Sequence, residues 1–171
     1  DADLDGYTAD VDCDDTNPAI HPNANELCNT VDDDCDGSID DGGCNPCIQG
    51  EFGGHTYQFC SSWNVNWNGA AGTCSSYGYY LVTVDGEAEN DFIAASAGGG
   101  DWWIGYSDSG WNNEGNWSWT GTASTSGYEN WNSGEPNNAG NEDCAEIGSA
   151  FGWHWNDVNC NSQQHYICEL D

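Results

Sequence analysis

Apolar residues are spaced regularly only after residue 46, where strand and helix periods follow one another. Residues 55–59 alternate between apolar and polar positions, as in a half-buried strand. A helix is predicted next because apolar side chains recur every three or four residues, at Trp67, Ala70, Ala71, Cys74 and Tyr77. Residues 81–84 predict another strand, and residues 87–97 predict a second helix that begins with acidic residues and ends at a run of glycines.

The rest of this region combines short apolar runs with one long polar stretch. Strands are predicted at residues 102–106, 117–119, 144–148, 152–155 and 164–168. Residues 120–143 are rich in Gly, Ser, Asn and Thr, and connections of this length are usually functional. We therefore expect a functional site on this long connection.

Residues 1–46 follow neither period and differ in composition from the rest. They contain 14 of the 30 acidic residues and four of the ten cysteines but a single aromatic residue, Tyr7. All ten tryptophans and the other six cysteines lie in residues 47–171. A short segment with few apolar side chains cannot build a core and is usually held by metal ions or disulfides. The sequence thus predicts two parts, an irregular segment over residues 1–46 and a domain over residues 47–171.

The chain carries a formal charge of −30 because it has 30 Asp and Glu and neither Lys nor Arg. Nucleic-acid partners are excluded, since binding them requires a basic surface that displaces phosphate counterions. No apolar run approaches the roughly 20 residues of a membrane-spanning helix, so we expect no membrane insertion. The ten cysteines favour disulfides and an extracellular location, secreted or on the cell surface, and the excess of carboxylates favours several bound Ca2+ ions.

An EF-hand type calcium loop can be traced at the start of the chain. Its positions 1, 3, 5, 6, 7 and 12 are occupied by Asp1, Asp3, Asp5, Gly6, Tyr7 and Asp12. The alternating carboxylates converge on one ion, the glycine permits a sharp turn with positive φ, and position 7 offers its carbonyl. The flanking residues are turn formers, which predicts a calcium loop without EF-hand helices.

A second copy of this pattern begins at residue 32. Its candidate ligands are Asp32, Asp34, Asp36, Ser38 and Asp40. Gly43 occupies position 12, so this loop would need another ligand, such as Asp41 or Asp14. Disulfides Cys13–Cys28 and Cys35–Cys44 would each close one short acidic loop, although spacing alone does not determine the pairing.

The succession of DxDxDG, DCDD, PNANELC and DDDCDGSIDD in residues 1–44 resembles the acidic, cysteine-containing repeats of secreted bacterial proteins. Some of these repeats are described as metal-binding or copper-binding. His21 is the only imidazole in the segment, and its oxygen-rich sites suit Ca2+ better than copper. The alternative interpretation is a disordered acidic linker.

Residues 47–170 contain an ordered set of short motifs. They are WNGAAGTC at 67–74, LVTVDGEAEN at 81–90, WIG at 103–105, EGNWSW at 114–119, EPN at 135–137, EDC at 142–144, WND at 155–157 and ICE at 167–169. This set resembles the C-type lectin domain. The resemblance implies an α+β fold with two helices, small antiparallel sheets and a long calcium-binding loop. In this chain the domain would be preceded by an irregular segment held together by disulfides and calcium.

The same resemblance implies three disulfides. They are Cys74–Cys168, which ties the first helix to the last strand, Cys144–Cys160 beside the long loop, and Cys47–Cys60, found in long-form members of the family. In an alternative pairing, Cys44 exchanges with Cys47.

The resemblance also implies a principal calcium site. Its ligands would be Glu135, Asn137, Glu142, Asn156 and Asp157, with a cis bond between Glu135 and Pro136. These residues supply about six oxygens, and an eightfold shell leaves room for two sugar hydroxyls that hydrogen-bond to the same residues. In the family, Glu-Pro-Asn accompanies mannose, glucose or fucose type sugars, and Gln-Pro-Asp accompanies galactose. An accessory calcium site would use Asp108, Glu114, Asn138 and Asp143.

The sequence therefore predicts a secreted, calcium-dependent module that binds mannose-type glycans, as part of an adhesin or surface protein. An enzyme is not expected, because no nucleophile elbow is present and the carboxylates are too abundant to single out a glycosidase pair. In the alternative, calcium only locks the long loop in a structural subunit of an extracellular fibre or surface layer, whose partners are copies of itself. A calcium-dependent ice-binding role is a third hypothesis.

Overall fold

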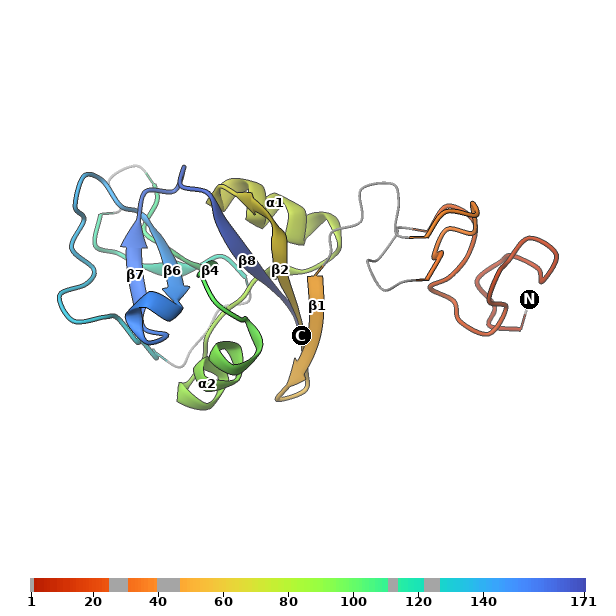
Figure 1. Cartoon of the computed structure of the whole chain (residues 1–171), viewed down its shortest axis with the longest axis horizontal. Coiled ribbons are helices and arrows are strands. Elements are labelled where there is room, and N and C mark those ends of the chain that lie inside the picture. The colour runs from red at the N-terminus through yellow and green to blue at the C-terminus, as the bar shows by residue number, and fades with distance from the viewer. Residues whose placement is uncertain (1, 25–30, 40–46, 111–113, 122–126) are drawn as a thin grey trace. The chain divides into compact units, whose positions relative to one another are not determined.

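The computed structural model describes residues 2–24, 31–39, 47–110, 114–121 and 127–171, without the side chains of residues 62 and 63. The chain divides into two compact units, Asp1–Cys47 and Ile48–Asp171 (Figure 1). Among the described residues, no helix combines the length and the apolar character needed to cross a bilayer.

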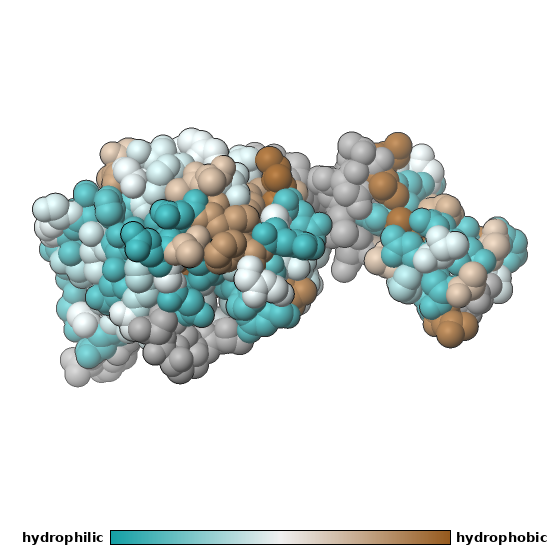
Figure 2. Space-filling model, turned by 90° about the horizontal axis from the view of Figure 1, so that it is seen from below, coloured by the Kyte–Doolittle hydropathy of each residue, from teal (hydrophilic) through white to brown (hydrophobic). Residues whose placement is uncertain are grey.

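The first unit consists of turns and bends in its described part up to residue 39. Ile20 is the one large apolar side chain that is buried there, whereas Leu4, Val11, Val31 and Ile39 are exposed. Hydrophobic residues accordingly appear on the surface of the first unit (Figure 2). Its described part thus has almost no hydrophobic core, as its composition predicts. Disulfides and polar contacts must hold this unit.

The described residues of the second unit form two helices and eight strands. In chain order they are β1 (Cys47–Phe52), β2 (His55–Val65), α1 (Trp67–Ser76), β3 (Tyr80–Leu81), α2 (Glu87–Ser96), β4 (Asp101–Ser107), β5 (Ser118–Trp119), β6 (Cys144–Gly148), β7 (Trp155–Val158) and β8 (Gln164–Leu170), with a short 3-10 helix, η1 (Ser149–Phe151), before β7. The strand order is β1-β2-β8-β4-β6-β7, with β3 on β8 and β5 on β4. Strands β4 and β8 run parallel, whereas β2–β8, β4–β6 and β6–β7 are antiparallel.

The two helices pack against opposite faces of the sheet (Figure 1). Cys168 of β8 is bonded to Cys74 of α1, and the neighbouring Ile167 lies opposite Phe59 of β2. Phe59 in turn contacts Phe92 of α2, with ring centroids 6.0 Å apart. Because successive side chains of a strand point to opposite faces, α1 and α2 flank the sheet on its two sides.

The core of the second unit lies between the sheet and α2 and extends under the long loop. Trp102 of β4 and Trp155 of β7 are among its largest fully buried side chains. Trp131 of the loop packs against this core and forms an isolated bridge with Trp155. The loop is therefore anchored to β7 by aromatic packing as well as by backbone pairing.

Most predicted elements occur close to their predicted bounds, and the differences have local causes. Residues 152–155 were predicted as a strand, but η1 ends at Phe151, a turn follows it at residues 152 and 153, and β7 begins only at Trp155. Gly152 and Trp153 have φ values of 65° and 64°, which are incompatible with extended backbone. Strand β1 was missed because its polar and apolar residues show no clear period.

Two of the disulfides implied by the resemblance are present in the second unit, Cys74–Cys168 and Cys144–Cys160. Cys47 and Cys60 each take part in a disulfide as well, and the bond between them stays a prediction. The Cys144–Cys160 bond joins the start of β6 to the turn after β7. It therefore clamps the two strands that border the long loop.

Candidate functional site

The long loop is held against β7 by the carboxylate of Asp157. Asp157 is only 1% exposed, and its two oxygens accept hydrogen bonds from the backbone nitrogens of Asn137 and Asn138, at 3.0 and 2.7 Å. Both donors directly follow the Glu135–Pro136 bond, which is cis, as the resemblance implies. The EPN turn and the WND strand, separated by 17 residues in sequence, thus form one site.

The remaining predicted ligands of the principal site lie around this turn. The side-chain amide of Asn137 donates to the Glu135 carboxylate. Glu142 accepts a 2.8 Å hydrogen bond from the nitrogen of Ala139, and its own nitrogen donates to the side chain of Asn138. Partial burial, followed by the neighbouring Asp157 carboxylate, raises the pKa of Glu135. Carboxylates brought together in this way favour a bound cation or proton.

Asn156, the fifth predicted ligand, is oriented by a residue that the sequence analysis missed. Its side-chain nitrogen donates a 2.9 Å hydrogen bond to Glu146, which lies directly opposite on β6. Glu146 is 3% exposed, and burial raises its pKa to about 7. The signal in the sequence was an acidic residue inside the otherwise apolar strand CAEIG.

The four residues predicted for the accessory site also come together. Asp108 is 2% exposed, and its nitrogen donates to the carbonyl of Asp143 at 3.1 Å. One Asp108 oxygen accepts from the nitrogen of Gly115, while Oδ1 is buried without a hydrogen-bond partner in the described part of the chain. Partial desolvation, followed by Asp108 and Asp143, raises the pKa of Glu114, whose carboxylate also interacts with Asn138. A buried carboxylate oxygen without a donor fits a cation site.

The first acidic loop has the geometry of a cation site. Asp3, Asp5 and Asp12 each bring one oxygen to within 4.8 Å of the others. The Oδ2 atom of each is buried and accepts no hydrogen bond from the residues that the structure describes. Gly6 has a φ of 102°, which gives the sharp turn that the motif requires. Asp1 lies outside the described residues.

The second acidic loop repeats this arrangement in a more exposed form. Asp32, Asp34 and Asp36 form a group with the same 4.8 Å spread. The backbone around them folds onto their side chains, since the nitrogen of Gly37 donates to Asp32 and that of Ser38 to Asp36. The further candidate ligands Asp40 and Asp41 lie outside the described residues.

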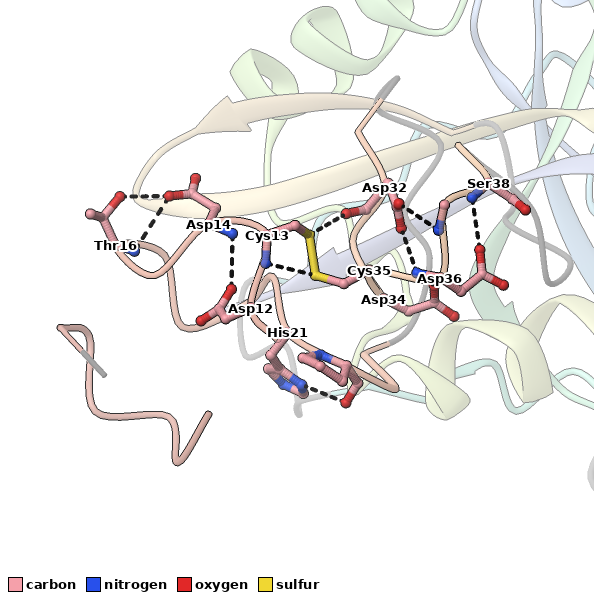
Figure 3. The surroundings of a disulfide bond; sticks show 12 residues. Asp12, Cys13, Asp14, Thr16, His21, Asp32, Asp34, Cys35, Asp36 and Ser38 are labelled. Atoms are coloured by element: carbon pink, nitrogen blue, oxygen red, sulfur yellow. Dashed lines mark hydrogen bonds between the residues drawn. A yellow bond between two sulfur atoms is a disulfide. The ribbon is translucent and has the colours of Figure 1, made fainter. Parts of the chain in front are cut away.

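Asp14, the alternative ligand for the second loop, faces elsewhere (Figure 3). Its Oδ1 accepts hydrogen bonds from the hydroxyl and the backbone nitrogen of Thr16, at 2.7 and 3.3 Å. These contacts form a local turn and leave this oxygen occupied.

The predicted disulfides of the first unit are wrong, because Cys13 is bonded to Cys35 (Figure 3). This excludes both Cys13–Cys28 and Cys35–Cys44, whose other members lie outside the described residues. The bond joins the two acidic loops instead of closing each one. The backbone after the first loop pairs with the second loop beside this bond, since the nitrogen of His21 donates to the carbonyl of Asp33 at 3.0 Å.

A third group of potential ligands, which was not predicted, lies at the ends of β2 and β8. The Nδ1 atom of His55 is 2.6 Å from Glu169 and 3.2 Å from Asp171. The second oxygen of Glu169 accepts from the nitrogen of Thr83 at 2.9 Å. The hydrogen bond to Glu169 raises the pKa of His55. Since these contacts satisfy both oxygens of Glu169, hydrogen bonding within the fold accounts for this group.

Comparison with family models assigns most of the chain. Residues 64–170 match the model of the lectin C-type domain, and residues 12–41 match the model of a metal-binding motif. The first match contains every predicted ligand of the principal and accessory sites. The second contains the candidate ligands from Asp32 to Asp41 of the second acidic loop and Asp12, the last residue of the first.

Individual relatives match about two thirds of the chain. A perlucin-like protein of Mytilus galloprovincialis is 41% identical over 116 residues, which cover 64% of this chain and 73% of the relative. Hepatic lectin of Gallus gallus is 37% identical over 120 residues, which cover 69% of this chain and 56% of the relative. The chain thus spans little more than half of hepatic lectin.

The fold is confirmed by solved structures. The C-type carbohydrate-recognition domain of cow CD23, crystallised in the presence of the oligosaccharide GlcNAc2Man3, superposes with a TM-score of 0.65. It shares 30% sequence identity, and the alignment covers 74% of this chain and 97% of that domain.

Proposed function

The chain belongs to the C-type lectin family, and we propose that its second unit binds mannose-type sugars through calcium. The family binds carbohydrates and is not enzymatic. In this proposal the protein is a secreted or cell-surface module that serves adhesion, and the calcium ligands are Glu135, Asn137, Glu142, Asn156 and Asp157.

The observation that carries the proposal is the double hydrogen bond from the EPN turn to Asp157. It holds Glu135 and Asn137 beside the WND strand. Carboxylate and amide oxygens, which are the ligands that Ca2+ prefers, thereby lie close together. The unpartnered Asp108 oxygen supports a second ion beside the first.

The chemistry of these side chains explains how a sugar would be recognised. Bound calcium would coordinate two neighbouring hydroxyl oxygens of the sugar. The carboxylates of Glu135 and Glu142 accept hydrogen bonds from those hydroxyls, and the amides of Asn137 and Asn156 donate to them. The order of acceptors and donors around the ion sets which pair of hydroxyls fits. Glu-Pro-Asn matches the mannose type by family resemblance, and the cow CD23 domain was crystallised in the presence of the oligosaccharide GlcNAc2Man3.

The test is retention on immobilised mannose in millimolar Ca2+ and in EDTA, with the double variant Glu135→Gln/Asn137→Asp beside wild type. We expect calcium-dependent retention of wild type on mannose. The variant exchanges an acceptor for a donor at position 135 and a donor for an acceptor at position 137, so it should lose mannose and gain retention on galactose. Equal thermal melting of both proteins in calcium provides the control for folding.

The same experiment decides against the proposal if calcium-saturated, folded wild type is retained on no sugar column. The site would then be structural, and the chain would be a calcium-stabilised subunit of a fibre or surface layer. Sedimentation of the calcium-bound protein would show the self-association that this alternative requires.

For the first unit we propose one calcium ion in the first acidic loop and one in the second. We predict that Asp12→Asn reduces the number of bound calcium ions by one, because Asp12 is 7% exposed and joins Asp3 and Asp5 around the loop. The matched control is Asp10→Asn, which removes an exposed carboxylate outside that group. Native mass spectrometry counts the ions, and an unchanged number in Asp12→Asn would contradict the assignment.

A further inference from the structure

We infer that Glu146 is a positioning residue that sets which end of the Asn156 side-chain amide faces the ligand. The inference rests on the proposed function, in which Asn156 offers an oxygen to calcium and a hydrogen to the sugar. Glu146 itself touches neither. Its effect passes through the hydrogen bond to Asn156.

The position of Glu146 in the sheet makes this contact unavoidable. Glu146 of β6 and Asn156 of β7 are directly opposed in the antiparallel pairing, so their side chains project on the same side. Glu146 is 3% exposed, and the chain has no Lys or Arg that could pair with it. A buried carboxylate of this kind needs hydrogen-bond donors, which two neighbouring side-chain amides provide.

Those two amides meet the two oxygens of the carboxylate. Asn156 donates through Nδ2 to Oε1 at 2.9 Å, and Gln164 of β8 donates through Nε2 to Oε2 at 2.5 Å. When Glu146 is ionised its carboxylate only accepts, so each amide then presents its nitrogen. Asn156 is thereby left with its oxygen and its second amide hydrogen, neither of which has a hydrogen-bond partner among the described residues. These are the two groups that a cation and a sugar hydroxyl require.

An amide turned by 180° would present a nitrogen where the ion needs an oxygen. Groups that orient a metal ligand in this way typically change metal affinity 10- to 100-fold when they are altered. Glu146 therefore tunes calcium affinity without contributing a ligand atom.

Two double variants test the orientation directly because they differ only at the half-buried position 164. In Glu146→Gln/Gln164→Glu, the new amide donates to the new carboxylate and offers its oxygen to Asn156, as in wild type. In Glu146→Gln/Gln164→Lys, the lysine donates to the new amide's oxygen, which turns that amide's nitrogen toward Asn156 and reverses the Asn156 amide. The single variant Gln164→Lys controls for the added positive charge, since Glu146 still accepts from Asn156.

Two readouts on the full chain separate calcium from sugar. Tryptophan fluorescence reports calcium binding in the second unit alone, because no tryptophan lies before residue 63. Retention on immobilised mannose at increasing Ca2+ reports sugar binding. Thermal melting in EDTA shows whether the variants are equally folded.

We expect the Gln164→Lys double variant to need at least tenfold more calcium in both assays. The Gln164→Glu double variant and the Gln164→Lys single variant should stay within about threefold of wild type. Equal calcium midpoints for the two double variants would overturn the inference. If wild type binds calcium but no sugar, the proposed function fails while the fluorescence midpoints still decide the role of Glu146. A wild type without any calcium response in its fluorescence would overturn both.

Discussion

Replacing Cys74 and Cys168 by serine should lower the free energy of unfolding of the second unit by about 4–5 kcal/mol. The bond joins residues 94 positions apart, so it restricts most of the unfolded unit, and the chain-entropy relation gives this magnitude for a loop of that length. Both cysteines are almost fully buried, so the serine hydroxyls gain no solvent contact in return. This is a large share of the stability of an ordinary domain.

Urea denaturation in saturating calcium, followed by tryptophan fluorescence, measures this loss. The matched control is Cys144→Ser/Cys160→Ser, whose sulfurs close a loop of only 16 positions and should cost about 3 kcal/mol. A greater loss from the shorter loop would contradict the entropic account. It would mean that the clamp between β6 and β7 contributes more than its loop length implies.

The calcium-free protein should be more stable at pH 5.5 than at pH 8, by roughly 2–3 kcal/mol. Burial raises the pKa of Glu146 to about 7 and raises the pKa values of Glu89 and Glu169 above the ordinary 4.5. An acid with a raised pKa binds its proton more tightly in the folded protein. Its contribution to stability is complete below about pH 4.5 and is lost as the pH rises toward the pKa of the group in the folded protein. The raised pKa of His55 acts in the same direction at higher pH, because its contribution is lost above about 6.5.

Thermal melts of calcium-depleted protein between pH 5 and 8 test this dependence, with Glu146→Gln as the informative variant. We expect a shallower fall in melting temperature for that variant. Glu51→Gln makes the same change of charge at an exposed position and should keep the wild-type slope. Saturating calcium should reduce the fall for every protein, because the ion replaces protons at the loop carboxylates. Stability that rises with pH in the absence of calcium would contradict the prediction.

The sequence was informative where a periodic pattern or an ordered motif carried the signal. The apolar face from Trp67 to Cys74 predicted α1, and the EPN and WND motifs predicted residues that the structure brings together around Asp157. The strand prediction for residues 152–155 was wrong because left-handed backbone at Gly152 and Trp153 interrupts an apolar run that has the composition of a strand.

The errors in the first unit have a different cause. The pairing of Cys13 with Cys35 goes with backbone hydrogen bonds from residues 21–23 to the second acidic loop, and these bonds leave no trace in residue type or spacing. The role of Glu146 was not predicted from the sequence for a related reason. Its importance comes from the β6–β7 register, which places it opposite Asn156, and register is a property of the folded sheet.

The Cys74–Cys168 bond also determines how the second unit would respond to mechanical tension. If the chain is pulled at both ends, the force runs along the backbone to Cys74, crosses the sulfur–sulfur bond and leaves through Cys168, close to the end of β8. Residues 75–167 lie outside this load path. The long loop with Glu135, Asn137 and Asp157 belongs to this unloaded segment, so stretching the chain would not pull directly on the site that holds the ligand.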